Sequence, residues 1–351
     1  MTVTNNDFIC WFETIKIADR PTVGGKGASL GELTAAGIRV PPGFVVTTAA
    51  FERFLRATDA DGSIRSTIAG LESGDTDQVA KVTATLRDRV RNAPFPKDLA
   101  SAVREAHAKL CGDEADFPVA IRSSATSEDS AEASFAGLQD TYLWIKGADA
   151  VIQSIRNCWA SLYSTESVSY RLRLKMPEGH IAMGVVVQRM VNSRSSGVMF
   201  TRSPTTGDRS VIAIEGSWGL GSCIVSGEVT PDTFLVNKVT GEIRGRTISD
   251  KARRHVPDLE KGGVLDLEVE EDKRNAACIS DEELSELAKI GKAIERHYGS
   301  AQDIEWSIDE SGTVYLLQSR PETVWANKDA EPVAPVKSSV LDHVFATFGK
   351  R

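Results

Sequence analysis

The chain has 351 residues, and its 41 Lys and Arg against 49 Asp and Glu give a formal net charge of −8. Apolar residues make up 41% and charged residues 26% of the sequence, which is typical of a globular protein and excludes a largely disordered chain. A pI near 5.3 argues against a nucleic-acid partner, and the longest apolar stretches are far shorter than the roughly 20 residues of a membrane-spanning helix, so we expect no membrane partner either.

The N-terminal segment and the cysteines both indicate a cytoplasmic protein. The first ten residues, MTVTNNDFIC, have neither a basic start nor an apolar run, so we expect no signal peptide. Five cysteines stand far apart and form no CxxC motif. An odd number at such spacings argues against a disulfide scaffold or a zinc site, and we interpret these residues as reduced thiols of the core.

The first informative segment is rich in glycine. Residues 23–33, VGGKGASLGEL, predict a flexible turn that leads into a short helix over residues 28–36. The sequence Pro-Pro-Gly at 41–43 breaks the chain before a strand over residues 44–47. Hydrophobic periodicity predicts the following elements next: helices over 77–92 and 97–110, a strand over 119–122, a loop over 123–140, a strand over 141–145, a helix over 148–163, strands over 183–190, 196–201, 210–215 and 233–237, and a helix over 280–298.

The order of these elements divides the chain into two lobes and a tail. Helices dominate residues 1–182 and strands dominate residues 183–325, which predicts an N-terminal and a C-terminal lobe of an α/β or α+β fold with mixed sheets. Ser280 and Glu283 form a capping box at the start of the last helix. Residues 326–351 predict a linker and a tail whose apolar side chains suit a groove of a partner.

The last two predicted strands, over residues 303–308 and 313–318, form a hairpin in which polar and apolar side chains alternate. With a turn centred at residues 310–311, Asp303 would lie opposite Gln318 and Glu305 opposite Leu316 on the two strands.

The polar side chains of this hairpin, Asp303, Glu305, Gln318 and Arg320, then share one face. In that register Glu305 and Gln318 are diagonal neighbours about 7–8 Å apart at Cα, so their side chains can converge on one ion. Hard oxygen ligands suit Mg²⁺, and an arginine beside them suits a phosphate. The alternative is the solvated outer face of an edge hairpin.

Two basic residues are candidates for phosphate binding. Lys26 lies in the glycine-rich turn, which lacks the Walker A spacing, but a lysine there can reach a phosphate as a point charge. Arg122 ends an apolar strand, so its charge needs a partner, and the small polar residues after it can form an anion-binding nest. The alternatives are an exposed turn lysine and a structural salt bridge.

Other motifs exclude other functions. The glycines at 216–221 follow the spacing GxxGxG, which differs from the GxGxxG of a Rossmann dinucleotide site. The HRD and DFG signatures of protein kinases are absent from the sequence. We interpret Asp232, after Pro231, as a turn residue.

Taken together, eight ordered segments resemble the nucleotide-binding domain of the phosphoenolpyruvate synthase and pyruvate phosphate dikinase family. They are GGKGASLGEL (24–33), GIRVPPGFVVT (37–47), AIRSSATSED (120–129), ASFAGLQDTYL (133–143), VVVQRMV (185–191), SGVMFTRSP (196–204), GLG…VSGEVTPD (219–232) and DIEWSID…VYLLQSRPET (303–323). The resemblance implies an α+β ATP-grasp fold, in which two lobes clamp ATP between them.

The resemblance also implies roles in phosphate binding. Lys26 and Arg122 would hold the phosphates of ATP, and Arg320 would bind the phosphate that is transferred. The loop around Gly137 and Thr141 would close over them. Lys26, Arg122 and Arg320 would act in catalysis by positioning and neutralising charge, without a nucleophile on this chain.

The remaining implied roles concern the base and the metal. Gln188, in the strand that links the lobes, would border adenine, and Glu215 would belong to the nucleotide site. Glu305 and Gln318 would bind Mg²⁺, with Asp303 nearby. The expected cofactors are therefore ATP and Mg²⁺.

The chain departs from the family pattern in two places. Ser222 follows Gly-Leu-Gly where relatives often carry an acidic residue, which puts a family role for that position in doubt. Family members also pass phosphate to a histidine in a Gly-Gly…Ser-His-Ala setting on a swivelling domain, and none of the five histidines here has that setting. We therefore expect a separate subunit to carry the phosphohistidine and the acceptor site. Such a divided enzyme is similar to phenylphosphate synthase, whose smaller ATP-handling subunit this chain resembles.

The function expected from this resemblance is transfer of the β-phosphate of ATP to a partner histidine, with release of AMP and Pi. The partner would then phosphorylate phenol. The alternatives are a component of a split phosphoenolpyruvate synthase, pyruvate dikinase or rifamycin phosphotransferase, a self-contained ATP-grasp ligase that forms ADP, and a non-catalytic ATP sensor.

Overall fold

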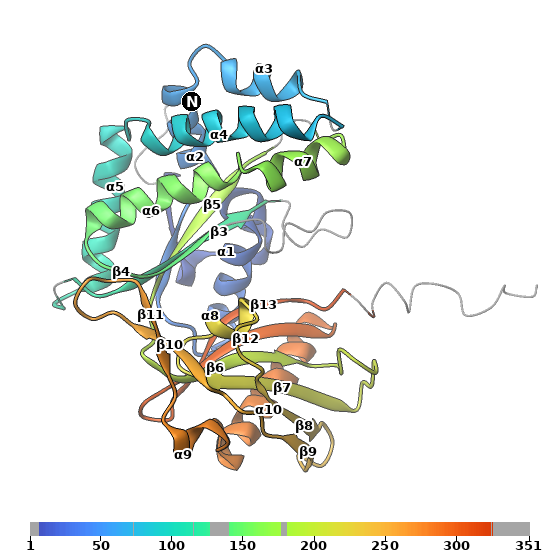
Figure 1. The fold of residues 1–351 in the computed structure, drawn as a ribbon. Helices are drawn as coiled ribbons and strands as arrows, with labels where there is room; N and C mark the ends of the chain where they lie inside the picture. The colour runs from blue at the N-terminus through green and yellow to red at the C-terminus, as the bar shows by residue number, and fades with distance from the viewer. Residues whose placement is uncertain are drawn as a thin grey trace, which may run out of the picture.

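The computed structural model describes residues 7–72, 74–114, 116–126, 140–176, 181–323 and 325 (Figure 1). Its strands are β1 (Ile9–Trp11), β2 (Gly43–Val46), β3 (Val119–Ala125), β4 (Thr141–Ile145), β5 (Met183–Arg189), β6 (Ser193–Phe200), β7 (Val211–Trp218), β8 (Asp232–Asn237), β9 (Ile243–Thr247), β10 (Arg253–Pro257), β11 (Val264–Glu268), β12 (Gln302–Asp309) and β13 (Val314–Pro321). Its helices are α1 (Arg20–Ala35), α2 (Thr48–Thr58), α3 (Ser63–Ala69), α4 (Thr76–Asn92), α5 (Lys97–Cys111), α6 (Ala148–Ser161), α7 (Thr165–Arg173), α8 (Ser222–Val225), α9 (Glu271–Arg274) and α10 (Asp281–Tyr298), with short 3-10 turns at η2 (Phe12–Thr14) and η3 (Ile17–Asp19).

Two sheets organise two lobes, one above the other in Figure 1. The first sheet has the strand order β1-β2-β5-β3-β4 and the second the order β13-β12-β6-β7-β8-β9, while β10 and β11 form a separate ribbon. The predicted α+β fold with two lobes is confirmed. The sheets are not mixed as predicted, because every strand pairing described in them is antiparallel.

The local predictions agree closely with the elements of the first lobe. The helices expected over 77–92, 97–110 and 148–163 correspond to α4, α5 and α6, and β4 has the predicted bounds. The first helix begins earlier than expected, at Arg20, because α1 runs through a kink in the glycine-rich turn. Strand β3 continues to Ala125, so the loop expected from residue 123 begins later, and residues 127–139 lie outside the described residues.

The core of the first lobe lies between its sheet and the helices that cross it. In Figure 1, α4, α6 and α7 lie above the sheet. The fully buried ring of Trp159 on α6 stacks on Phe95 at 5.7 Å and lies 4.9 Å from the ring of Phe54 on α2. The apolar stripe predicted for α6 therefore faces the core.

The core of the second lobe lies between its sheet and α10. Leu284, Leu287 and Ile294 of α10 pack with Trp306 of β12 in one buried cluster. The predicted capping box is confirmed, since the Ser280 hydroxyl accepts from the backbone N–H of Glu283 and the Glu283 carboxylate accepts from that of Ser280.

Helix α1 lies between the lobes and touches both. Leu33 packs into the core of the second lobe, whereas Val23 packs with Phe12 and Val45 in a smaller cluster beside the first sheet. The Ser29 hydroxyl donates to the backbone oxygen of Ser319 on β13 at 2.5 Å. The predicted lobe boundary at residue 182 lies before β5, which pairs with β2 and β3, so the chain leaves the first sheet only after that strand.

The register of the β12–β13 hairpin differs from the predicted one. Asp303 opposes Arg320, and Glu305 opposes Gln318 directly rather than diagonally. The turn is one residue longer than assumed, because Gly312 adopts a positive φ of 82° and its N–H donates to the Asp309 carbonyl. An irregularity between Glu305 and Trp306 shifts the register once more.

The cysteines behave as predicted, since all five are free and only Cys10 is not fully buried. Among the described residues, no helix combines the length and the apolar character that a membrane crossing requires. Asp232 is not a turn residue as predicted. It begins β8 fully buried, where its carboxylate pairs with the equally buried Lys251 at 2.7 Å.

Candidate functional site

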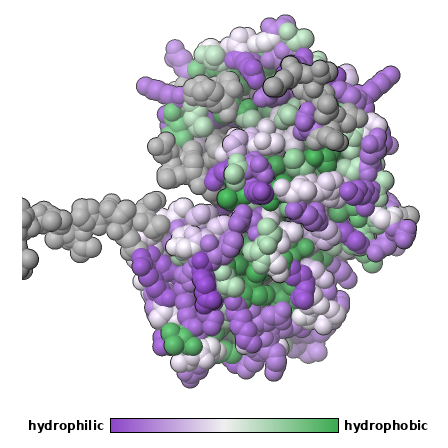
Figure 2. Space-filling model, turned by 180° about the vertical axis from the view of Figure 1, so that it is seen from behind, coloured by the Kyte–Doolittle hydropathy of each residue, from purple (hydrophilic) through white to green (hydrophobic). Residues whose placement is uncertain are grey.

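A cavity of about 350 Å³ lies between the two lobes and takes its walls from both. Four of the predicted site residues line it: Arg122 and Thr141 from the first sheet, Gln188 from β5, and Glu305 from β12. Figure 2 shows hydrophobic residues near the middle of the molecule, with largely hydrophilic residues toward its ends. A cavity of this size with a few convergent polar groups is typical of a small-molecule site.

Arg122 joins the two lobes through its guanidinium group. It lies on β3 and is 9% exposed, so its charge needs compensation. Its Nη1 donates to the Leu317 carbonyl at 2.7 Å, and its Nη2 donates to Gln318 Oε1 at 2.7 Å and to the carboxylate of Glu305. The salt-bridge alternative raised from the sequence is thus present, and it is formed with the predicted metal residues.

Glu305 and Gln318 lie side by side because the observed register pairs them directly across β12 and β13. Directly opposed residues of an antiparallel pair point to the same face of the sheet. The next residues across the sheet in this row are Val198 on β6 and Glu215 on β7. Glu215 therefore faces the same side as Glu305, two strands away.

Electrostatics also connect Glu215 with the hairpin. Burial raises the pKa of the Glu215 carboxyl, and the nearby negative charge of Asp303 raises the pKa further. Asp303 itself accepts a hydrogen bond from Nε of the opposed Arg320 at 2.8 Å. The hairpin thus carries two acidic residues, each with a guanidinium partner, at adjacent positions on one face.

The glycine-rich segment that carries Lys26 lies against β3. Gly24 approaches β3 so closely that a Cβ there would lie 1.9 Å from the Ser124 carbonyl oxygen. The Ser124 hydroxyl accepts from the backbone N–H of Gly27 at 3.0 Å and donates to the Val23 carbonyl at 2.8 Å. Ser124 is two residues after Arg122 on one strand, so Lys26 emerges from a turn fixed against the arginine-bearing strand. Lys26 does not line the cavity.

The other predicted site residues differ in their positions relative to the cavity. Thr141 opposes Arg122 across β3 and β4. Gln188 is 2% exposed, and its amide donates to the Pro41 carbonyl at 3.3 Å. Gly137 lies outside the described residues. Gln318 and Glu215 do not line the cavity, but Gln318 bonds Arg122 and Glu215 opposes Val198, and both of those residues do. Asp303 and Arg320, which bond each other, do not line it.

Sequence reasoning missed one wall of the cavity. It is formed by residues between β7 and β8, in and around α8: Leu220, Gly221, Ser222, Ile224, Val225 and Ser226. The glycines at 216–221 fail the dinucleotide spacing, and the segment 219–232 resembles the family pattern, but neither observation predicts a cavity wall here. Glycines allow a segment to approach a strand closely. A cluster of them directly after a strand is the signal that could have indicated this wall.

The donor set at the hairpin fits a hard divalent cation. Arg122 Nη2 contacts both Gln318 Oε1 and the Glu305 carboxylate, so one positively charged group already reaches both oxygens at once. A cation at that point would receive one carboxylate and one amide oxygen, the ligand types that Mg²⁺ takes together with water and phosphate. Arg122 and Arg320 add the geometry that binds phosphate oxygens in pairs.

Comparison with known proteins shows the family of the chain. Residues 20–339 match the family described as "Pyruvate phosphate dikinase, AMP/ATP-binding domain". This chain belongs to that family. It is 44% identical over 318 residues to a "Probable phosphoenolpyruvate synthase" of Methanocaldococcus jannaschii, covering 90% of this chain and 27% of that protein. It is 41% identical over 365 residues to the "Phosphoenolpyruvate synthase" of Aeropyrum pernix, covering 95% of this chain and 44% of that protein.

The similarity covers only part of each of these relatives. The chain spans less than half the length of these relatives. Among solved structures, D-alanyl-alanine synthetase A of Vibrio cholerae covers 85% of this chain and 58% of its own at 11% identity, with a TM-score of 0.26. That superposition is too loose to add to the family match.

Proposed function

We propose that this chain binds Mg²⁺-ATP between its lobes and transfers the β-phosphate of ATP to a histidine of a separate subunit, with release of AMP and Pi. The convergence of Arg122, Glu305 and Gln318 at the cavity carries this proposal. These residues bring a guanidinium from one lobe and two oxygen ligands from the other to a single point. Membership of an AMP/ATP-binding family supports the choice of nucleotide.

The phosphate end of the nucleotide lies at the hairpin in this proposal. Lys26, Arg122 and Arg320 bind phosphate oxygens and neutralise the charge that develops during transfer. Thr141, which opposes Arg122 across β3 and β4, borders the phosphates. These residues act by positioning and charge alone, so the reaction needs no nucleophile on this chain.

The base and the metal occupy the two sides of this phosphate end. Gln188, beside the link between the lobes, borders the base, and Glu215 supports the metal side from the next strands. Glu305 and Gln318 hold Mg²⁺, with Asp303 next to them. The ion, when bound, shields the phosphate oxygens and makes the phosphorus more electrophilic.

The chemical step is an in-line displacement at the β-phosphorus. A neutral imidazole nitrogen of the partner histidine attacks, the bond to the α-phosphate oxygen breaks, and AMP leaves with that oxygen. The pyrophosphoryl group on the histidine then loses its terminal phosphate to water as Pi. A phosphohistidine remains, ready for delivery to the final acceptor.

The histidine comes from another subunit in this proposal because the described histidines have other contacts. His107 is buried against Cys111, with its Nε2 3.7 Å from Sγ. His297 bonds Glu32 on the surface at 2.7 Å. No histidine of the described ranges lines the cavity.

For the final acceptor we propose phenol, which the partner converts to phenylphosphate. A second candidate is pyruvate, because the relatives are named phosphoenolpyruvate synthases. The two differ in a product that is simple to measure. Supplying the reconstituted enzyme with each acceptor and separating phenylphosphate from phosphoenolpyruvate decides between them.

The experiment that tests the central proposal uses ATP labelled in the adenine. The purified chain is assayed alone and with the proteins that co-purify with it from its source. We expect little AMP from the chain alone, AMP formation with the partner, and acid-labile phosphate on a partner histidine. Robust ADP formation by the isolated chain would instead indicate a self-contained ligase, and tight ATP binding without turnover under any partner would indicate a sensor.

A further inference from the structure

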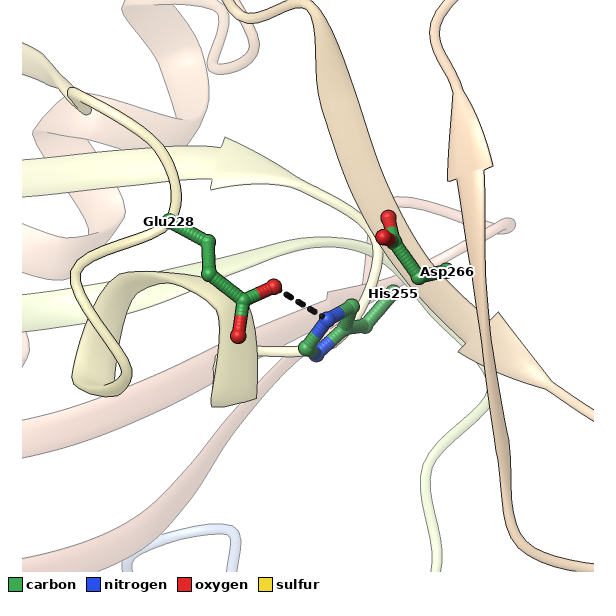
Figure 3. Close-up of side chains that lie close together, drawn as sticks. All are labelled: Glu228, His255 and Asp266. Carbon is green, nitrogen blue, oxygen red and sulfur yellow. Dashed lines mark hydrogen bonds and ion pairs between the residues drawn. The ribbon is translucent and has the colours of Figure 1, made fainter.

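A short chain of hydrogen bonds reaches the cavity from the β10–β11 ribbon. Ser222 Oγ lies 2.7 Å from Nδ1 of His255, and Nε2 of His255 lies 3.0 Å from Oε2 of Glu228. Figure 3 shows the Glu228 carboxylate facing the imidazole ring of His255. Ser222 lines the cavity, while the His255 side chain is 14% exposed. No part of the proposed reaction uses these three residues.

The Glu228 carboxylate determines which atoms donate in these two hydrogen bonds. A carboxylate can only accept, so Nε2 of His255 carries the proton that binds Glu228. A neutral imidazole has one N–H, so Nδ1 is then an acceptor. The tautomer of His255 is assigned here from its hydrogen-bond partners. With a neutral His255 ring, the Ser222 hydroxyl donates its proton to Nδ1. A hydroxyl that donates its one proton in this way keeps only acceptor capacity for a ligand, and Ser222 lines the cavity.

The position of Ser222 along the cavity follows from the register of β6. Val198 opposes Glu305 at the phosphate end, and Ser196, two residues earlier, points to the same face. The Ser196 hydroxyl donates to the Gly219 carbonyl at 2.5 Å, which fixes the segment before Ser222 over this level of the strand. Two residues of strand span about 7 Å.

The other end of the cavity lies at the link between the lobes. Met190, Val191 and Ser193 line it there, just before Ser196 in the chain. Ser222 is therefore level with the middle of the cavity, between the linking segment and the metal and phosphate residues. In a nucleoside triphosphate the sugar occupies that middle position between base and phosphates.

The neighbouring carboxylate of Asp266 does not turn this cluster into a metal site. Glu228, His255 and Asp266 offer ligand atoms within 4.8 Å of one another. The Asp266 carboxylate, however, accepts from Nε of Arg253 at 2.8 and 2.9 Å and from its Nη2 as well. Arg253 already supplies a positive charge to Asp266, and Figure 3 draws no bond between Asp266 and His255.

We propose that the Ser222–His255–Glu228 chain orients the Ser222 hydroxyl as an acceptor that reads a hydroxyl group of the nucleotide's sugar. This inference rests on the proposed function, because it requires a nucleoside triphosphate in the cavity. Ser222 is then a specificity residue for the sugar of the nucleotide, and His255 and Glu228 are positioning residues. The ligand group that it recognises is a donor, which excludes the phosphates as its partner.

The test compares the affinities of the purified chain for ATP, 2′-deoxy-ATP and 3′-deoxy-ATP in the presence of Mg²⁺. We expect ATP to bind about 3- to 10-fold more tightly than at least one deoxy form, as one good hydrogen bond provides. Ser222→Ala should weaken ATP binding by the same factor and leave that deoxy form unchanged, so that the ratio of the two dissociation constants falls to about 1.

Three further variants distinguish an orienting effect on the Ser222 hydroxyl from a loss of folding stability. Ser222→Thr keeps the hydroxyl and should keep the ratio. His255→Phe keeps a ring of similar size but removes the acceptor for the Ser222 proton, so the ratio should fall while the unfolding temperature changes little. Ser66→Ala is the matched control, because this exposed helical serine bonds only its own helix at Ser63.

The outcomes distinguish this inference from the function on which it rests. No ATP binding by the folded wild-type chain overturns both. Tight ATP binding without discrimination against either deoxy form, or discrimination that persists in Ser222→Ala, overturns the role of Ser222 alone. A ratio that is unchanged in His255→Phe overturns the orienting role of the imidazole.

Discussion

Arg122 on β3 forms an ion pair with Glu305 on β12, and this pair connects the two lobes across the cavity. The two side chains are 11% and 34% exposed, so the pair is partly shielded from water. A cation bound at Glu305 would compete with Arg122 for the same carboxylate. In the proposed complex the arginine therefore moves its hydrogen bonds from the hairpin to the phosphates.

This competition predicts an effect of Mg²⁺ in the absence of nucleotide. Arg122→Ala leaves Glu305 and Gln318 without their cationic partner, so Mg²⁺ alone should raise the unfolding temperature of this variant more than that of the wild type. ATP affinity should fall about 10- to 100-fold, because charge-assisted hydrogen bonds are lost. Thermal unfolding and calorimetric titration measure both effects. Equal stabilisation of the two proteins by Mg²⁺ would show that Arg122 and the ion do not share a site.

Glu305 provides the most direct test of the metal site. Glu305→Gln keeps the size of the side chain but removes the charge, and it should reduce AMP release by the reconstituted complex about 100-fold or more. Glu310→Gln is the matched control, since Glu310 is an exposed glutamate in the turn of the same hairpin. Unchanged AMP release in the Glu305 variant would remove the basis of the proposed mechanism.

The raised pKa of Glu215 predicts that replacing this residue by glutamine stabilises the protein in a pH-dependent way. The folded state holds this proton more tightly than the unfolded chain, so the contribution of Glu215 to stability is lost as pH rises above the ordinary value of 4.5. Glu215→Gln should therefore raise the free energy of unfolding at neutral pH, and this gain should vanish well below pH 4.5. Urea unfolding at several pH values measures it. A gain of equal size at all pH values, or an equal gain in the exposed Glu242→Gln, would contradict the assignment.

The close approach of α1 to β3 predicts different costs at two glycines. Gly24 has φ 75° and ψ 177°, a conformation open almost only to glycine, and a Cβ there meets Ser124 at 1.9 Å. Gly24→Ala should cost about 3 kcal/mol of stability and weaken ATP binding, because the Lys26 turn is displaced. Gly37→Ala shares the positive φ of 73° but meets nothing within 4 Å, so it should cost about 1 kcal/mol with ATP binding unchanged. Equal costs at both positions would contradict this contact.

The buried pair of Lys251 and Asp232 predicts a large effect on stability. Nζ of Lys251 donates to Asp232, to the Ser249 carbonyl and to the Arg274 carbonyl, so all three protons are used. Lys251→Met leaves the Asp232 carboxylate buried without its cation and should cost about 3–5 kcal/mol in urea unfolding. Lys273→Met removes an exposed lysine whose pair with Glu270 is 3.8 Å long, and it should cost less than about 1 kcal/mol.

The sequence predicted most elements because their signals are local. Ser280 and Glu283 sit three residues apart and form a capping box whatever surrounds them. The alternation of apolar and polar residues in β12 placed Asp303 and Glu305 on one face for the same reason, since the period of a strand is two residues. The eight ordered segments are also local in sequence, and the family that they resemble is the one to which the chain belongs.

Long-range pairings were decided only by the tertiary structure. The register that puts Gln318 directly opposite Glu305 depends on the positive φ of Gly312 and on one irregularity in the ladder, and alternation alone specifies neither. Asp232 finds Lys251 nineteen residues away in the chain, and Ser222 finds His255 thirty-three residues away. Periodicity determines which side of an element a residue faces, but packing determines what it meets there, because contacts between distant segments depend on how whole elements are placed.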